Sequence, residues 1–222
     1  MTITIIGTSH IARTSIRDIK HAYDSLQPDI IAVELDYSRM VGLLSKTKDS
    51  LPLSIIKRIG VSGYLFALIG RALQKRLGDI VHMTPGSDMK YAIKIAQHNK
   101  KTLALIDRDI IITLQRFSQA FTTKEKFRLA KDIILAPFSK RIRLDLRQVP
   151  PEELIETLLL ELKKRYPGIY LALIHERNVH MAKQLSHLHN QHPDARILAV
   201  VGAGHKKGME RLLSETFKKP QG

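Results

Sequence analysis

The chain has 222 residues, of which 44% are hydrophobic, and its formal net charge is +15. This length fits one large domain, or a domain with insertions, and it includes enough apolar residues to bury a core. The absence of cysteine excludes disulfides and thiolate metal ligands. The positive charge favours an acidic partner, an anionic membrane surface or nucleic acid, or else marks a basic solvated surface.

The N-terminus leads directly into a β-branched run with no basic region before it, so the sequence predicts no signal peptide. The longest apolar stretches are short or interrupted, which argues against a membrane span. We therefore expect a protein of the cytoplasm or of the cytoplasmic face of a membrane.

Four runs of β-branched and aliphatic residues predict buried strands at residues 2–6, 30–35, 102–106 and 195–201. A helical segment that ends near Leu26 separates the first two runs. Because strand, helix and strand alternate, the strands are expected to pair in parallel with right-handed crossovers. The predicted fold class is α/β, with a mixed or mainly parallel sheet flanked by helices in a single domain, 1–222.

Two helical insertions are predicted at about 37–77 and about 110–166. The apolar centre of the first, residues 61–69, is either a buried helix or hairpin or a surface that touches a membrane or a second copy. The second insertion is expected to break near Thr122. Ser87 is a plausible N-cap for the helix that begins there.

Reactive side chains follow the end of each predicted strand. In open parallel sheets, ligands bind beyond the carboxyl ends of the strands. If the strands are parallel neighbours, the clusters share one edge, and we expect a site there. The clusters are His10 after the first strand, Glu34 and Asp36 after the second, Asp107, Arg108 and Asp109 after the third, and His205 after the last.

Glu34 lies near the end of an apolar strand, where a buried carboxylate needs a partner or a ligand. It is either a metal ligand or general base, or the salt-bridge partner of Arg39 or Arg108. His10 and His205 each end a Gly-X-X-His sequence that follows a strand. Two histidines and one carboxylate suit a divalent transition ion with open positions for water.

The segment HERNVH, His175–His180, invites comparison with a zinc-peptidase motif whose histidines lie four residues apart on one helical face. Here the histidines are five apart, about 140° around a helix, so that motif is excluded. Helical periodicity predicts that Arg177 and Asn178 enter the site, while Glu176 faces solvent. The alternative for Asn178 is a hydrogen-bonded core amide. The predicted stripe on this helix consists of Leu171, Ile174, Asn178, Met181, Leu185 and Leu188.

Six blocks of the sequence together resemble the TraB family, which includes the TraB/PrgY pheromone-shutdown proteins and is related to the TIKI metalloproteases and the GumN proteins. The blocks are GTSHIARTS, PDIIAVELDYSRM, PGSDMKYAI, LALIDRDIIITLQR, ERNVHMAKQL and VVGAGHKKGM. The resemblance implies an α/β core with helical insertions, as in TIKI, ChaN and EreA proteins. Many members carry a C-terminal membrane region, and this chain stops at Gly222 without one, as a trimmed soluble domain would.

The resemblance also implies a metal-dependent hydrolase site built from the two Gly-X-X-His sequences. Activity is not uniform in the family, so the fold does not fix the chemistry. The implied roles are metal ligand for His10 and His205, ligand or base for Glu34, lining of the site for Arg177 and Asn178, and support around the ligands for Asp88, Asp107, Arg108 and Asp109.

The resulting hypothesis is hydrolysis of a peptide bond assisted by a divalent Mn, Co or Zn ion. Glu34 takes the proton of water or completes the coordination, and Arg177 or Arg108 stabilises the oxyanion. One alternative is a non-catalytic protein that binds and sequesters a peptide. Another is binding to an anionic membrane or to nucleic acid, although no motif predicts a specific nucleic acid. The apolar residues 61–69 make a homodimer an expectation.

Overall fold

A computed structural model describes residues 3–9, 13–45, 53–81, 86–135 and 151–218. Its centre is a four-stranded sheet with the order β1-β4-β2-β3, in which every neighbouring pair is parallel. This confirms the predicted α/β class. The strands are β1 (Ile3–Thr8), β2 (Ile30–Val33), β3 (Thr102–Leu105) and β4 (Ile197–Gly202).

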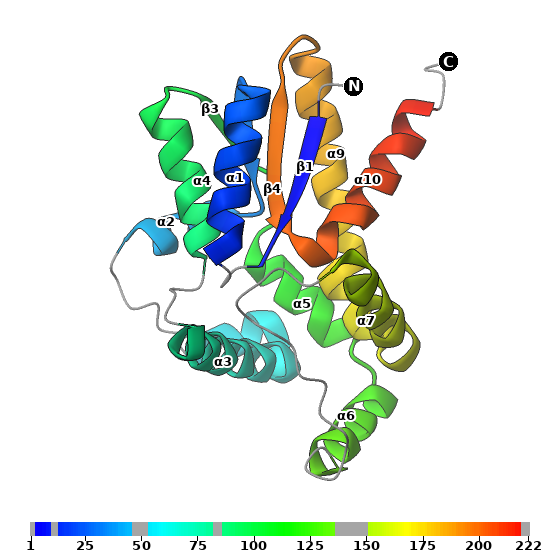
Figure 1. Cartoon of the computed structure of the whole chain (residues 1–222). Coiled ribbons are helices and arrows are strands. Elements are labelled where there is room, and N and C mark those ends of the chain that lie inside the picture. Colours follow the sequence, from blue (N-terminus) through cyan, green and yellow to red (C-terminus); the bar gives the residue numbers. More distant parts are fainter. Residues whose placement is uncertain (1–2, 10–12, 46–52, 82–85, 136–150, 219–222) are drawn as a thin grey trace.

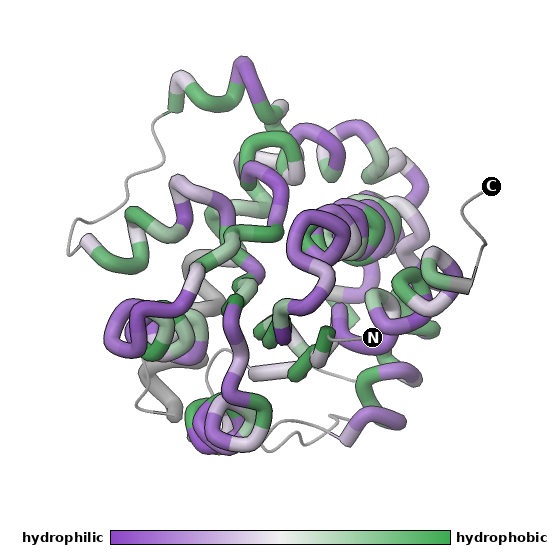
Figure 2. The backbone as a smooth tube through the Cα atoms, turned by 90° about the horizontal axis from the view of Figure 1, so that it is seen from above, coloured by the Kyte–Doolittle hydropathy of each residue, from purple (hydrophilic) through white to green (hydrophobic). Residues whose placement is uncertain are grey.

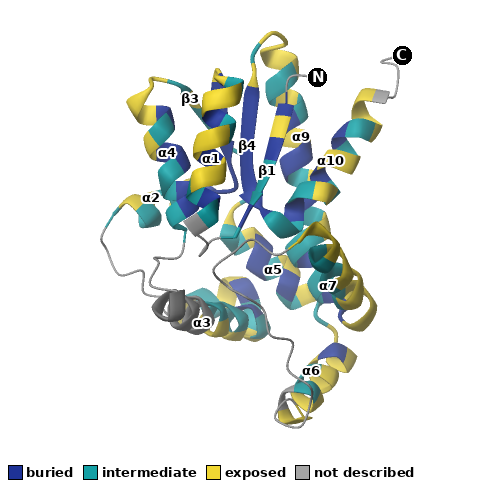
Figure 3. Cartoon of the chain, in the orientation of Figure 1, coloured by how far each residue is buried: buried dark blue, intermediate teal, exposed yellow. Residues whose placement is uncertain are grey.

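Helices cover both faces of the sheet (Figure 1). On one face lie α1 (Arg13–Leu26) and α4 (Ser87–His98), and on the other lie α9 (Glu176–Gln191) and α10 (Ala203–Lys218). Each face has its own apolar core, because alternate residues of a strand point to opposite sides. Leu198 and Val200 of β4 pack with α1 and α4, whereas its Ala199 and Val201 pack with α9 and α10. Every residue of β4 is buried, as expected for a central strand (Figure 3).

The remaining helices lie mainly beyond the carboxyl ends of the strands, in the lower half of Figure 1. The break predicted near Thr122 is confirmed, since one helix ends at Ala120 and the next begins at Thr123. The elements are α2 (Tyr37–Leu44), a 3-10 turn (Leu53–Ile55), α3 (Ile56–Val81), α5 (Ile110–Ala120), α6 (Thr123–Leu135), α7 (Glu152–Arg165), α8 (Pro167–Tyr170) and a π-helical segment (Leu171–His175).

The predicted N-cap of α4 is wrong by one residue. The helix begins at Ser87, and the cap position belongs to Gly86, whose φ of 80° is left-handed. This conformation favours glycine over a residue with a Cβ. The Ser87 hydroxyl is buried without a hydrogen-bond partner in the described part of the chain.

The apolar segment of α3 packs on α5 with one side only. The rings of Phe66 and Phe117 stack with their centres 4.3 Å apart. Val61, Leu65 and Ile69 remain 52–63% exposed, so the alternative of a buried helix does not hold for these three side chains. Figure 2 shows hydrophobic and hydrophilic residues alternating around the helices.

By length and composition alone, one window of the described residues, Leu53–Gly70, could cross a membrane. Only 11% of this segment is buried. The sequence predicts that the apolar stretches are too short or too interrupted to span a bilayer, and this segment is long enough by the criterion of length. The expected interruption is present, because Gly60 has non-helical φ and ψ angles of 73° and 163°.

Candidate functional site

The carboxyl ends of the four strands meet at one edge of the sheet, as the sequence predicts. β1 and β4, the first and last strands, lie side by side, with Thr8 opposite Gly202. β2 is the other neighbour of β4, and it delivers Glu34 to the same edge. His10 lies outside the described residues.

The Glu34 side chain is buried and bonded at both oxygens. Its Oε2 accepts a hydrogen bond of 2.5 Å from the backbone amide of Gly202, at the end of β4. Its Oε1 forms an ion pair with Arg177 and lies 3.4 Å from Nε2 of His205. The sequence left open that Glu34 forms a salt bridge, and it does so. The prediction that its partner is Arg39 or Arg108 is wrong, because the partner is Arg177.

Arg177 is the hub of the site, because its guanidinium joins three side chains. Its Nε and Nη2 bind the two oxygens of Asp107 at 3.1 and 2.6 Å, the fork geometry that suits a carboxylate. Its Nη1 lies 2.9 Å from Nε2 of His205. Burial lowers the pKa of Arg177, but the carboxylates of Glu34 and Asp107 outweigh it and raise the pKa above its ordinary value. Arg177 is therefore a permanent cation.

His205 is held in one tautomer by Asn178. The Asn178 Oδ1 lies 2.6 Å from Nδ1 of the imidazole. Since a carbonyl oxygen only accepts, Nδ1 carries the proton. In the neutral ring, Nε2 then keeps its lone pair and faces Glu34 and Arg177. A second residue that orients an imidazole in this way is typical of metal-binding and catalytic histidines.

The π-helical segment just before α9 changes which residues of this helix face the core. A π turn contains one more residue than a turn of regular α-helix. It therefore rotates the preceding residues around the helix axis relative to the residues that follow. Leu171, placed in the buried stripe by a constant helical period, is 39% exposed. After the segment the prediction holds, and Asn178, Met181 and Leu185 are buried.

The prediction that Glu176 faces solvent is wrong. Its carboxylate forms ion pairs with Arg108 at 2.9 Å and Arg116 at 2.6 Å. Hydrogen bonds from Arg116 lower the pKa of Glu176 below its ordinary value, against the opposing effect of burial. The pairing also explains Arg108, which bonds to Glu176, to Thr113 and to the Ala172 carbonyl rather than to Glu34.

The other predicted acids occupy different places along the edge. The Asp88 carboxylate accepts a 2.6 Å hydrogen bond from the Thr8 hydroxyl at the end of β1. Asp109 caps α5 by accepting a 2.6 Å bond from the amide of Ile111. Asp36 caps α2 by accepting from the Arg39 amide, and its other oxygen accepts from the Ile110 amide at the start of α5, so Asp36 and Asp109 have structural roles.

Two residues at the edge carry no site role in the sequence prediction. Thr8 bonds to Asp88, and the Arg39 guanidinium bonds to Oδ2 of Asp107 at 2.8 Å. Thr8 precedes His10 at the end of a β-branched run, which is the signal that could have suggested it. The Arg39–Asp107 pair joins residues 68 positions apart and has no local signal.

The geometry of His205 and Glu34 fits two ligands of one ion. Two ligand atoms about 2.1 Å from a tetrahedral ion lie roughly 3.4 Å apart, which is the distance between Nε2 and Oε1 here. Within the described ranges, no group of three or more His, Asp or Glu side chains is arranged to hold a metal. A third protein ligand would therefore have to come from outside them, where His10 lies.

The fold and this edge define a class: a parallel α/β protein with an ionised, buried cluster where the strands end. Comparison with known proteins gives the family. Residues 1–219 match the TraB/PrgY/gumN family, and the chain belongs to that family.

Relatives from an archaeon and from mammals match nearly the whole chain. The uncharacterized protein MJ1365 of Methanocaldococcus jannaschii is 35% identical over 219 residues, which cover 96% of this chain and 53% of that protein. The TraB domain-containing proteins of Homo sapiens and Mus musculus are each 25% identical, over 94% of this chain and 62% of their own length. The chain thus spans little more than half the length of these relatives.

Proposed function

We propose that this chain is a metal-dependent peptide hydrolase whose ion is held by Nε2 of His205 and Oε1 of Glu34, with His10 as the third protein ligand. The observation that carries the proposal is the 3.4 Å separation of those two atoms, together with the Nδ1–H tautomer imposed by Asn178. When the imidazole is neutral, these two features direct lone pairs of Nε2 and Oε1 to one point.

A bound metal would lie next to the positive charge of Arg177, because the Arg177 guanidinium contacts both proposed ligands. Two of its nitrogens remain bound to Asp107 whether or not Glu34 is engaged elsewhere. That fork keeps the cation beside the site. From there Arg177 can donate to a carbonyl oxygen that gains negative charge during hydrolysis.

Glu34 has two oxygens with different surroundings, and this leaves either of two roles open to it. Oε2 is fixed by the Gly202 amide, while Oε1 faces His205. A carboxylate held at one oxygen can bind an ion or accept a proton from water with the other. When bound, a divalent Mn, Co or Zn ion supplies Lewis acidity and lowers the pKa of water.

The test is metal content and peptide cleavage measured on the same samples. Wild-type protein loaded with Mn, Co or Zn is expected to retain close to one ion after dialysis and to cleave peptides from a mixed library. His205→Ala and Glu34→Gln should lose both properties. His187, an exposed histidine of the same helix as Asn178, offers the matched control His187→Ala, which should keep both.

Circular dichroism of each variant separates loss of the site from loss of the fold. A folded His205→Ala protein that still binds the ion and still cleaves peptides would end the proposal. Saturable peptide binding without turnover at any metal concentration would favour the alternative, a non-catalytic peptide-sequestering protein.

A second proposal concerns the partner of α3. Val61, Leu65 and Ile69 are exposed in a chain with a net charge of +15. Exposed apolar side chains on a basic protein favour an anionic membrane surface, where burial of apolar area adds to electrostatic attraction. We therefore assign this face of α3 to contact with anionic lipid.

A further inference from the structure

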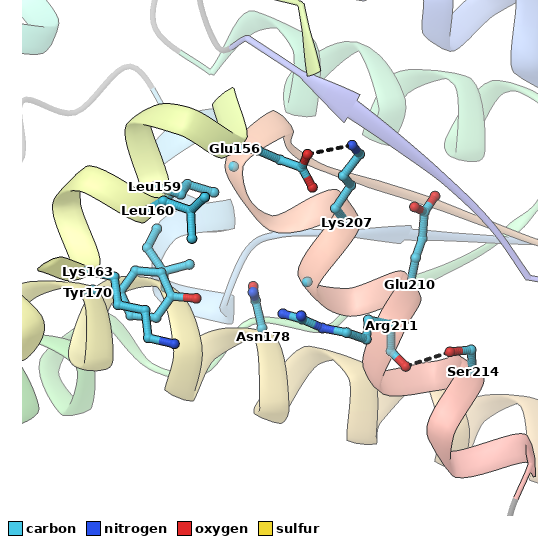
Figure 4. A pocket seen from close by; sticks show the side chains of 13 residues that line it. Glu156, Leu159, Leu160, Lys163, Tyr170, Asn178, Lys207, Glu210, Arg211 and Ser214 are labelled. Carbon is cyan, nitrogen blue, oxygen red and sulfur yellow. Dashed lines mark hydrogen bonds and ion pairs between the residues drawn. The ribbon is translucent and has the colours of Figure 1, made fainter. Parts of the chain in front are cut away.

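A cavity of about 730 Å³ lies between α7, the start of α9 and α10 (Figure 4). We refer to it as the α7–α10 cavity. Its apolar wall comprises Leu159, Leu160 and Ile174, and Leu160 remains 68% exposed. Its opposite wall is polar and includes Asn178, the residue that orients His205. The cavity is therefore amphipathic and is joined to the site at the sheet edge by one hydrogen bond.

The cations of the cavity are not equally engaged. Lys207 forms an ion pair of 2.9 Å with Glu156, and the Lys163 amine lies 5.6 Å above the Tyr170 ring. The Arg211 guanidinium has no hydrogen bond or ion pair to any described residue. In Figure 4 the side chains of Arg211, Lys163 and Tyr170 point towards the part of the cavity where Asn178 lies.

Asn178 itself carries an unused donor. The residue is only 4% exposed, and its Oδ1 is occupied by His205. Its Nδ2 has no hydrogen-bond partner among the described residues, although the side chain lines the cavity. Because Nδ2 is not one of the fully buried atoms that lack a partner, water or a polar ligand atom in the cavity can reach it. The three cations of the lining, Lys163, Lys207 and Arg211, outnumber its two carboxylates, Glu156 and Glu210, so an anionic acceptor fits best.

We propose that the α7–α10 cavity binds the free carboxylate of an apolar C-terminal residue. Arg211 and Nδ2 of Asn178 donate to the carboxylate, and Leu159, Leu160 and Ile174 contact the apolar side chain. This inference rests on the proposed function in one respect: it takes the C-terminal residue to belong to a peptide substrate. The binding itself needs neither a metal nor turnover.

The probe is N-acetyl-leucine, titrated by calorimetry in the presence of EDTA, with N-acetyl-leucine amide as its neutral counterpart. The acid is expected to bind saturably and at least roughly tenfold more tightly than the amide, since a hydrogen-bonded charge is lost. Arg211→Gln should weaken binding of the acid by a similar factor. Asn178→Asp should also weaken it, because it keeps an acceptor for His205 but replaces the donor with an anionic oxygen.

Arg17→Gln is the matched control, since it removes the same charge from the exposed Arg17 of α1, whose side chain is 79% accessible. It should bind as the wild type does. Equal binding of acid and amide, or unchanged binding in Arg211→Gln, would overturn the proposal. Tighter binding of N-acetyl-aspartate α-amide would overturn the assignment to a chain terminus. Because EDTA is present throughout, failure of the hydrolase proposal leaves these outcomes unaffected.

Discussion

Gly208→Ala tests whether the sequence after His205 is shaped to position the imidazole. Gly208 lies in α10, one turn after His205, and packs against Asn178. A Cβ at Gly208 would lie 2.2 Å from Nδ2 of Asn178, and ordinary contact begins near 3.4 Å. The Asn178 amide must therefore move by about 1.2 Å, which its 2.6 Å hydrogen bond to His205 does not tolerate.

The expected cost is about 1–3 kcal/mol of unfolding free energy, since the buried Nδ1–H of His205 loses its acceptor. Gly204→Ala is the matched control in the same helix. Its Cβ would meet only Leu159, at 4.0 Å. In a helix, glycine to alanine normally stabilises by up to roughly 1 kcal/mol, so the two variants should change stability in opposite directions.

Urea unfolding followed by circular dichroism measures the stability of both variants. Nitrogen-15 NMR of the imidazole reports the tautomer of His205, which should change in Gly208→Ala alone. If Gly208→Ala is as stable as Gly204→Ala and keeps the Nδ1–H tautomer, the reasoning about this contact is refuted.

Glu125→Gln should destabilise the chain by about 1–3 kcal/mol in urea unfolding at pH 7, because the Glu125 carboxylate accepts from Thr122 at 2.9 and 2.8 Å and from the Gly168 amide at 2.7 Å. Burial raises the pKa of Glu125, but these hydrogen bonds lower it overall. Its contribution to the free energy of unfolding is therefore complete above the pKa of the unfolded chain, near 4.5, and is lost as the pH falls through the lower pKa of the folded protein. Wild-type stability should therefore fall more steeply than that of the variant below about pH 4.5, and parallel curves would contradict this assignment. Replacing Leu65 and Ile69 with serine should reduce co-sedimentation with phosphatidylserine vesicles while leaving stability within about 0.5 kcal/mol, because both side chains are exposed. Equal sedimentation with phosphatidylcholine vesicles would argue against a charge-dependent membrane contact.

The strands and their common edge could be predicted because both depend on local sequence. Runs of β-branched residues mark the buried strands, and parallel pairing brings their carboxyl ends together whatever the side chains are. For this reason Glu34 and His205 were expected near one another, and their side chains lie 3.4 Å apart. The metal-ligand role assigned to them stays a prediction.

The partners of the charged residues could not be predicted in the same way. A guanidinium reaches several residues along and across helices, so the sequence suggests Arg39 or Arg108 as the partner of Glu34, whereas the packing of α9 brings Arg177 to it. The π-helical segment adds a second obstacle. Nothing in the composition of LALIH indicates a π-helical turn. The turn nevertheless changes which of the preceding residues face the core, so a constant helical period fails for them.

The buried cluster is balanced in charge, and this has a consequence for ligand binding. Glu34 and Asp107 provide two negative charges, and Arg177 and Arg39 provide two positive ones. A divalent ion adds two positive charges where few waters can screen them, so an anion bound nearby becomes more favourable. Since Asn178 connects the α7–α10 cavity to His205, Mn²⁺ should tighten binding of N-acetyl-leucine, and N-acetyl-leucine should tighten binding of Mn²⁺ by the same factor. Titrating each ligand at saturating and zero concentrations of the other measures that factor, and a value of one would mean that the cavity and the sheet edge act independently.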